Sequence, residues 1–210
     1  MPEEFIIWLG KNYVELLGAT LGLTYIFFSI RQSIFTWPVG LLTSALYTYV
    51  FFSAKFYADM LLQVYYVAIS MYGWYHWLKG NPAKNADLEV SQMPKRYYLP
   101  LVLVCIILSL FFAFGLKNYT DSPVPIADSI TTAFSIVATW MLARKYYEHW
   151  IIWVFVDFFS VGLYVWKGLW PTAILFVVYT IMAVLGYISW RKDWKKLNHE
   201  KLNLSAEAIS

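Results

Sequence analysis

The stretch Tyr97–Leu116 reads YYLPLVLVCIILSLFFAFGL, and none of its side chains carries a charge. An α-helix rises about 1.5 Å per residue and needs about 20 apolar residues to cross the hydrocarbon core of a bilayer. The stretch has that length and that composition. It therefore predicts a membrane-spanning helix in the middle of the chain.

Six further stretches of similar length and character flank it: Val14–Ile30, Ile34–Ser53, Ala58–Leu78, Ile126–Ala143, Trp150–Trp166 and Pro171–Trp190. Of the 210 residues, 60% are hydrophobic and only 14% are charged, whereas soluble domains hold about 25% charged residues. We therefore predict an all-α membrane protein with seven transmembrane helices. The N-terminus lacks the pattern of a cleavable signal peptide. The polar segment Lys79–Arg96 is predicted to be mobile, and the tail after Trp194 disordered.

The sequence also repeats itself at an offset of 113 residues. Identical residues occupy matched positions in the two copies: Arg31 and Arg144, Trp37 and Trp150, Leu62 and Leu175, Val64 and Val177, Tyr66 and Tyr179, Gly73 and Gly186, Trp77 and Trp190, Lys79 and Lys192. Matched Trp, Gly and Arg residues at one fixed offset are uncommon by chance. They indicate two repeats of three helices each, joined by the span at Tyr97–Leu116.

Three helices plus a linker helix make four crossings, so the second repeat starts on the same side of the membrane as the first. We therefore predict two parallel three-helix bundles in a 3+1+3 arrangement, which is one of the repeat types that transporters use, SWEET proteins among them. The expected divisions are residues 1–79 for the first repeat, 80–125 for the loop and linker span, 126–192 for the second repeat and 193–210 for the tail.

The distribution of Lys and Arg predicts the orientation. One side of the membrane receives 4 of these residues and the other receives 12. Because cytoplasmic loops are enriched in Lys and Arg, the C-terminus is expected in the cytoplasm and the N-terminus outside. Lys and Arg after Trp190 are interpreted as a cytoplasmic membrane-flanking segment, and no nucleic-acid partner is expected.

Polar residues inside the spans are costly and usually face the interior of a helix bundle. They fall at helical spacing on three spans: Gln63, Tyr66, Ser70, Gly73 and Trp77; Asp128, Thr132, Ser135 and Thr139; Trp150, Trp153, Asp157 and Tyr164. The alternative for Asp128 is a first-turn carboxylate favoured by the helix dipole. Glu15 and Asp59 lie near span ends and are interpreted as structural.

Indole and phenol rings beside a carboxylate suit a flat cationic heterocycle. A cation over an indole gains roughly 0.5–2 kcal/mol, and a buried carboxylate balances the charge of the ligand. Few Asn and Gln residues lie in the spans, which argues against a sugar as the substrate. The candidate substrate-binding residues are Trp150, Trp153, Asp157, Gln63, Tyr66, Thr43, Tyr164 and Asp128.

The chain resembles the PnuC family of bacterial vitamin transporters. The resemblance runs from about Glu15 to Trp190. It is carried by the following motifs: Tyr57-Ala58-Asp59, Leu62-Gln63-Val64, Tyr72-Gly73-Trp74-Tyr75-x-Trp77, Ala127-Asp128-Ser129, Ser135-Ile136-Val137-Ala138 and Arg144-Lys145-Tyr146-x-Glu148-x-Trp150-x-x-Trp153.

The resemblance implies a multi-pass protein of the bacterial inner membrane that takes up a vitamin by facilitated diffusion, with trapping by a cytoplasmic kinase. It also implies a pocket between the bundles to which Gln63, Trp150 and Trp153 contribute. Members for nicotinamide riboside carry Asn where this chain has Thr43 and Asp157. The carboxylate favours thiamine, so thiamine is the first expectation and nicotinamide riboside the alternative. Riboflavin and an ion-coupled carrier are further alternatives.

Other functional classes find little support. The three histidines, His76, His149 and His199, lie in no metalloprotease spacing, and His149 is interpreted as a residue of the membrane interface. The single cysteine, Cys105, excludes a disulfide within the chain and a multi-thiolate metal site. We expect no enzyme activity, no cofactor and no metal, while a homo-oligomer stays open.

Overall fold

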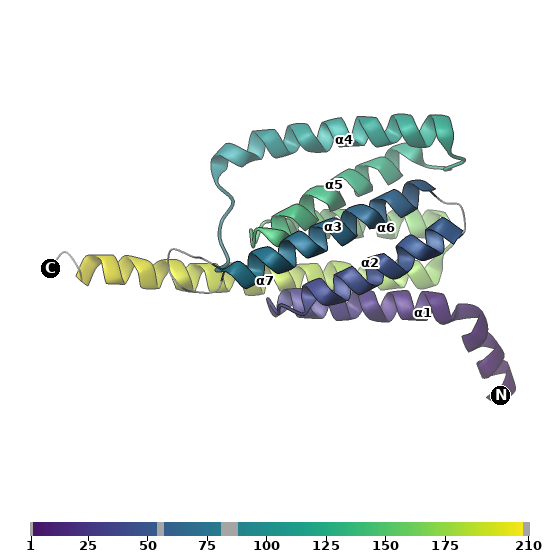
Figure 1. Cartoon of the computed structure of the whole chain (residues 1–210), viewed down its shortest axis with the longest axis horizontal. Helices are drawn as coiled ribbons and strands as arrows, with labels where there is room; N and C mark the ends of the chain where they lie inside the picture. Colours follow the sequence, from purple (N-terminus) through teal and green to yellow (C-terminus); the bar gives the residue numbers. More distant parts are fainter. Residues whose placement is uncertain (1, 54–56, 81–87, 208–210) are drawn as a thin grey trace. The chain divides into compact units, whose positions relative to one another are not determined.

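The computed structural model describes residues 2–53, 57–80 and 88–207, and the side chains of residues 16–53, 60–80 and 88–203. The helices follow one another along the chain (Figure 1) as α1 Pro2–Ile30, α2 Thr36–Ser53, α3 Tyr57–Lys79, the short 3₁₀ helix η1 Lys95–Tyr97, α4 Tyr98–Tyr119, α5 Pro125–Ala143, α6 His149–Trp166 and α7 Trp170–Glu207. Each predicted span overlaps one α-helix, although α1 begins well before, and α7 ends well after, the predicted span. The prediction of an all-helical chain is confirmed.

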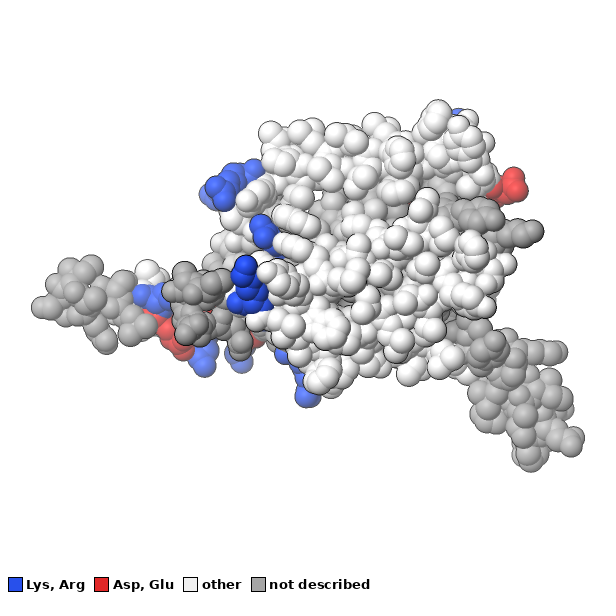
Figure 2. Space-filling model, viewed as in Figure 1, with Lys and Arg blue, Asp and Glu red and all other residues white. Residues whose placement is uncertain are grey.

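Four of the helical segments in the described part of the chain are long and apolar enough to cross a membrane: Lys95–Tyr119, Pro125–Ala143, His149–Trp166 and Trp170–Asn203. Leu16–Ile30 is a shorter apolar segment. Helix α2 and the described part of α3 are less apolar because Thr, Ser, Tyr and Gln side chains interrupt their aliphatic residues. The surface of α4 is uncharged along most of its length, with charged side chains near its ends (Figure 2).

The chain divides into two compact units, Met1–Trp74 and Tyr75–Ser210. In the second unit, α4 packs on α5, α5 on α6, and α6 on α7. The boundary falls inside α3 because Trp77, near the end of that helix, packs within the second unit. Its ring lies 6.3 Å from that of Trp190, and its indole N–H donates to the carbonyl of Ala143 at 3.2 Å.

The α1–α2 joint of the first unit turns through a left-handed residue, Gln32, with φ of 55°. Three backbone hydrogen bonds close the end of α1: Arg31 N–H to Phe27, Gln32 N–H to Ser29 and Ser33 N–H to Phe28. Residues outside glycine adopt positive φ uncommonly. The turn is therefore a specific feature of this joint.

The α5–α6 joint of the second unit has the same conformation at positions 113 residues later. Lys145 has φ of 54°. The matching hydrogen bonds run from Arg144 N–H to Trp140, Lys145 N–H to Leu142 and Tyr146 N–H to Met141. The two joints therefore share backbone geometry as well as sequence.

A second correspondence concerns the matched Trp and Gly residues. In the first unit, a Cβ added at Gly73 would overlap the ring of Trp37. In the second unit, a Cβ at Gly186 would lie 2.6 Å from Cε2 of Trp150. Both tryptophans are buried. In each unit, the absence of a side chain at the glycine is what lets the indole lie against the neighbouring helix.

The expectation of a disordered tail after Trp194 is wrong, and that of a mobile segment Lys79–Arg96 is wrong for residues 88–96, while residues 81–87 lie outside the described part of the chain. Helix α7 continues past Trp194 to Glu207, with Lys196 and Glu200 one turn apart and Lys201 paired with Glu89. The residues that precede α4 are also held in place: Ser91 forms an isolated parallel bridge with Tyr146. Both features depend on partners distant in sequence, which composition does not reveal.

Candidate functional site

One face of α6 carries half of the predicted site residues. Trp150 and Asp157 are buried, with 3% and 5% of their surface exposed, while Trp153 and Tyr164 are half-buried. Ser160, on the same face, is also buried. The face predicted from helical spacing is therefore the inner face of this helix.

Asp157 stands out because its buried carboxylate makes no hydrogen bond or ion pair with any described residue. Burying a carboxylate without a partner is costly, and such groups in membrane spans usually mark sites of function. Trp153 lies one helical turn before it, since residues four apart share a face. The pair offers a negative charge next to an aromatic plane.

Trp150 lies in an aromatic cluster with His149 and Trp190. Its ring centroid is 4.5 Å from that of His149 and 5.9 Å from that of Trp190. Its indole N–H is buried and has no hydrogen-bond partner among the described residues. Trp150 therefore packs against Gly186 and keeps a buried donor that no described residue satisfies.

The sequence suggests His149 as a residue of the membrane interface, and the structure places it at the start of α6 with its side chain inside the protein. The imidazole is fully buried, and its two ring nitrogens have no hydrogen-bond partner in the part of the chain that the structure describes. It packs edge-on against Trp190 at 4.9 Å. The matching Thr36 of the first unit is also fully buried, so the two units share this feature, which residue type alone does not reveal.

Asp128 has partners of its own at the first turn of α5. The hydroxyl of Ser122 donates to one carboxylate oxygen at 2.6 Å, and the ammonium of Lys167 lies 4.0 Å from the other. Tyr164 is close enough to interact with Asp128 electrostatically. Asp128 and Tyr164 therefore lie together at the end of α6 that is opposite to Trp150.

The predicted residues of the first unit are Thr43, Gln63 and Tyr66, all half-buried. The Thr43 hydroxyl donates to the Val39 carbonyl at 2.7 Å, which leaves its oxygen able to accept a further bond. Gln63 makes no hydrogen bond with another described residue. The ring of Tyr66 lies 5.5 Å from that of Tyr65. The side chains of Glu15 and Asp59 lie outside the described residues.

The first half of the Arg144–Trp153 motif has a structural role. The Lys145 ammonium donates to the Leu88 carbonyl at 2.8 Å and lies 4.4 Å from the ring centroid of Trp77. Both carboxylate oxygens of Glu148 lie 3.1 Å from the N–H of Met93. These two residues fasten the segment before α4 to the α5–α6 joint.

Glu148 also accepts a hydrogen bond from the Tyr98 hydroxyl at 3.4 Å. Burial raises the pKa of Glu148 above its ordinary value, and the hydrogen bonds from Met93 and Tyr98 oppose that rise. The net direction is upward. Desolvation therefore outweighs the hydrogen bonds at this carboxyl.

Glu148→Ala is expected to loosen residues 88–94. The change leaves the buried Met93 N–H without an acceptor, a loss worth about 1–3 kcal/mol, so amide exchange there should accelerate about 5- to 150-fold. Glu148→Gln, which keeps one acceptor, should have a smaller effect. The control is Glu200→Ala, which removes an exposed pair with Lys196. Equal exchange rates in the Glu148→Ala and Glu200→Ala proteins would contradict this assignment.

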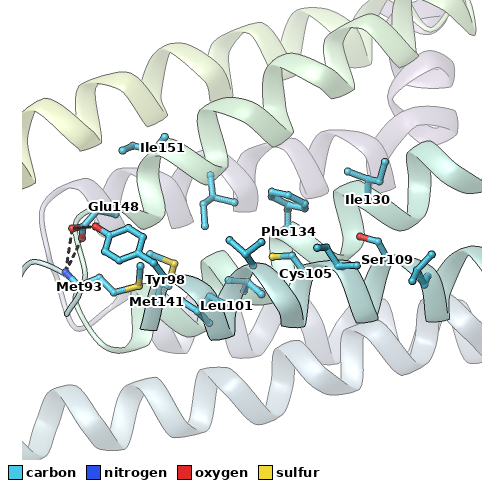
Figure 3. A pocket seen from close by; sticks show the side chains of 15 residues that line it. Met93, Tyr98, Leu101, Cys105, Ser109, Ile130, Phe134, Met141, Glu148 and Ile151 are labelled. Atoms are coloured by element: carbon cyan, nitrogen blue, oxygen red, sulfur yellow. Dashed lines mark hydrogen bonds between the residues drawn. The ribbon is translucent and has the colours of Figure 1, made fainter. Parts of the chain in front are cut away.

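A separate cavity of about 650 Å³ lies between α4, α5 and α6 (Figure 3). Its walls are almost entirely aliphatic and aromatic, with Glu148 and Tyr98 at one end and Ser109 and Ile130 toward the other. None of the predicted site residues lines it. The described residues also contain no group of three or more His, Cys, Asp or Glu suited to a metal ion.

Apolar helices with a polar, aromatic inner face are those of a multi-pass helical membrane protein. The chain belongs to the PnuC family, because the family model described as nicotinamide mononucleotide transporter matches residues 12–192. The resemblance seen in the sequence is thereby confirmed. Members of this family are transporters rather than enzymes.

Several relatives have established names. The nicotinamide riboside transporter PnuC of Escherichia coli is 28% identical over 203 residues, covering 85% of each chain. The PnuC of Neisseria mucosa is 26% identical, covering 88% of this chain and 74% of that protein. The riboflavin/roseoflavin transporter RibM of Streptomyces davaonensis is 28% identical, covering 90% of this chain and 86% of its own.

The fold has a solved counterpart. The crystal structure of the vitamin B3 transporter PnuC superposes with a TM-score of 0.71 over 92% of this chain and 87% of that one, at 24% sequence identity. The similarity shows that the two chains share a fold.

Proposed function

We propose that this protein carries nicotinamide riboside into the cell by facilitated diffusion. The observation that carries a cationic vitamin as substrate is the buried carboxylate of Asp157, which has no hydrogen-bond or ion-pair partner among the described residues and lies one turn from Trp153. Nicotinamide riboside has a flat cationic ring, which an indole face attracts and a carboxylate neutralises. Relatives named for this vitamin support the choice.

Thiamine is the second candidate. It was the first expectation from the sequence, and no relative described above is named for it. Asp157 is the observation that favours it, because a full carboxylate suits the thiazolium and the amino group of thiamine. Riboflavin is uncharged and gives Asp157 no partner, although one relative is named as a riboflavin transporter.

Two parallel three-helix bundles joined by α4 remain our proposal for the architecture, with the divisions at residues 79, 125 and 192. The shared geometry of the α1–α2 and α5–α6 joints and the two Trp–Gly contacts support it. With 12 of 16 Lys and Arg residues on one side, the C-terminus would lie in the cytoplasm of a bacterial cell and the N-terminus outside. A cytoplasmic kinase would then trap the vitamin by adding a negative charge.

The two sequence repeats differ at the positions of the proposed substrate-binding residues. The position matching Trp153 is Gly40, where a Cβ would lie 2.9 Å from the Tyr25 ring and 3.2 Å from the Ser70 hydroxyl. The position matching Asp157 is Ser44, which is also buried. Helix α2 thus uses these positions for close packing, while α6 places an indole and a carboxylate there. The second copy would therefore supply the charged part of the site.

The experiment is a calorimetric titration of the purified protein with nicotinamide riboside, thiamine and riboflavin in turn. Binding of nicotinamide riboside alone would support the proposal. Binding of thiamine alone would reverse the order of the first two candidates, and binding of riboflavin alone would refute a site built for a cation.

Asp157→Asn is expected to shift the ratio of affinities about tenfold toward nicotinamide riboside and away from thiamine. A hydrogen bond to a charged group is stronger than one to a neutral group by about 1 kcal/mol, and thiamine offers the carboxylate more donors. Asp128→Asn is the comparison, because Asp128 already has Ser122 and Lys167 as partners. If only the Asp128→Asn variant shifts the ratio of affinities, the carboxylate that binds the cationic vitamin is Asp128, at the other end of α6.

A further inference from the structure

The cavity between α4, α5 and α6 is suited to a ligand very different from a vitamin. Thirteen of its fifteen lining residues carry aliphatic, aromatic, thiol or thioether side chains, and only Ser109 and Glu148 fall outside these types. A polar vitamin would lose its hydrogen bonds to water there and gain few in return. A hydrocarbon chain would lose nothing.

The length of the cavity matches one leaflet of a membrane. Its α4 wall runs from Tyr98 to Leu110, which is about 18 Å along a helix axis. The hydrocarbon core of a bilayer is about 30 Å thick, so one leaflet contributes about half of that. An acyl chain that enters at the start of α4 would reach the middle of the membrane at Leu110.

The start of α4 carries the features of a headgroup region. Lys95 and Arg96 are exposed there, and Figure 2 shows Lys and Arg side chains gathered where this helix begins. The Arg96 guanidinium lies 5.0 Å from the ring centroid of Tyr97, whose ring meets that of Trp140 edge-on at 6.4 Å. Tyr and Trp at this depth are typical of the membrane–water interface.

Charge complementarity selects the headgroup. Two exposed cations lie at this end of the cavity, and the carboxylate there, Glu148, is already engaged by the Met93 N–H and the Tyr98 hydroxyl. Positive side chains near the membrane surface attract anionic lipids.

We propose that this cavity binds one acyl chain of an anionic phospholipid, with the phosphate against Lys95 and Arg96. The lipid would fill the space between α4 and the α5–α6 pair. It would therefore act as a structural lipid of the second unit rather than as a substrate.

The test is native mass spectrometry of the full-length protein, delipidated in detergent and titrated with phosphatidylglycerol or phosphatidylcholine of the same acyl chains. The wild-type protein should retain one phosphatidylglycerol per chain and prefer it about thirtyfold, since each of two cations near the surface contributes about fivefold. Equal retention of the two lipids would overturn the choice of an anionic headgroup.

Two pairs of variants separate the cavity from the general surface. The preference for phosphatidylglycerol should disappear in the double variant Lys95→Gln, Arg96→Gln. It should persist in the control double variant on α7, Lys192→Gln, Lys195→Gln. Val102→Trp, at an exposed position that lines the cavity, should lower retention about tenfold or more, because the indole fills the space. Ile107→Trp, at a similarly exposed position on α4 but outside the cavity, should not lower it.

Equal lipid retention in the Val102→Trp and Ile107→Trp proteins would refute the proposed site. A Val102→Trp protein that changes its oligomeric mass and keeps its lipid would instead identify the cavity as a contact between copies of this chain.

Discussion

Gly186→Ala is expected to destabilise the second unit by about 1–3 kcal/mol. The new methyl group would lie 2.6–2.7 Å from the Trp150 indole. This ring is held between His149 and Trp190 and is almost completely buried, so it has little room to move. The gain in helix propensity from glycine to alanine, about 1 kcal/mol, opposes the loss but does not outweigh it.

Thermal unfolding in detergent measures this effect, and the chain supplies its own controls. Gly115 and Gly162 are helical glycines with no atom within 4 Å of an added Cβ, so alanine at either position should leave the unfolding temperature unchanged or raise it. Adding Trp150→Phe to the Gly186→Ala protein should restore part of the stability. If Gly186→Ala and Gly162→Ala unfold at the same temperature, the close approach of the indole is not a constraint.

Trp153→Ala is expected to weaken the binding of the cationic vitamin about tenfold or more while leaving the fold intact. Stacking of an aromatic side chain on a heterocyclic base is worth about 1–3 kcal/mol, and the charge adds a cation–π attraction. Trp153 is half-buried, so part of its ring is accessible from outside the protein. The affinity is measured by calorimetry on the same preparations whose unfolding has been recorded.

The matched control is Trp166→Ala at the end of α6, where the indole is 67% exposed. Its removal should change neither affinity nor stability by much. Gln63→Ala is the companion variant in the first unit and should also weaken binding. Normal affinity in both the Trp153→Ala and the Gln63→Ala proteins would show that the substrate site lies elsewhere.

The sequence predicted the helices well because each is a long apolar run between short polar joints. The ends of α2, α5 and α6 fall within two residues of their predicted positions. Helical spacing also predicted the inner face of α6, since residues three and four apart share a face. The repeat offset of 113 residues matched the α1–α2 joint with the α5–α6 joint. The positive φ at Gln32 and Lys145 could not be predicted from the type of either residue.

Contacts between distant residues were beyond the sequence. Nothing in the polar segment before α4 shows that Met93 donates to Glu148, because that contact exists only once α5 and α6 have packed. The burial of His149 follows from its position between Trp150 and Trp190, which lie on different helices. For the same reason the apolar cavity, whose walls come from three helices, had no signature in any one of them.

The Trp–Gly contacts have a consequence for how this sequence drifts over evolutionary time. In each unit the indole and the glycine behave as a single mutational unit, because a larger residue at Gly73 or Gly186 is tolerated only with a smaller ring opposite. Enlarging the glycine first gives an overpacked protein, and shrinking the ring first leaves a cavity, so either single substitution is destabilising. Positions 37 and 73, like positions 150 and 186, should therefore covary among descendants or stay fixed together.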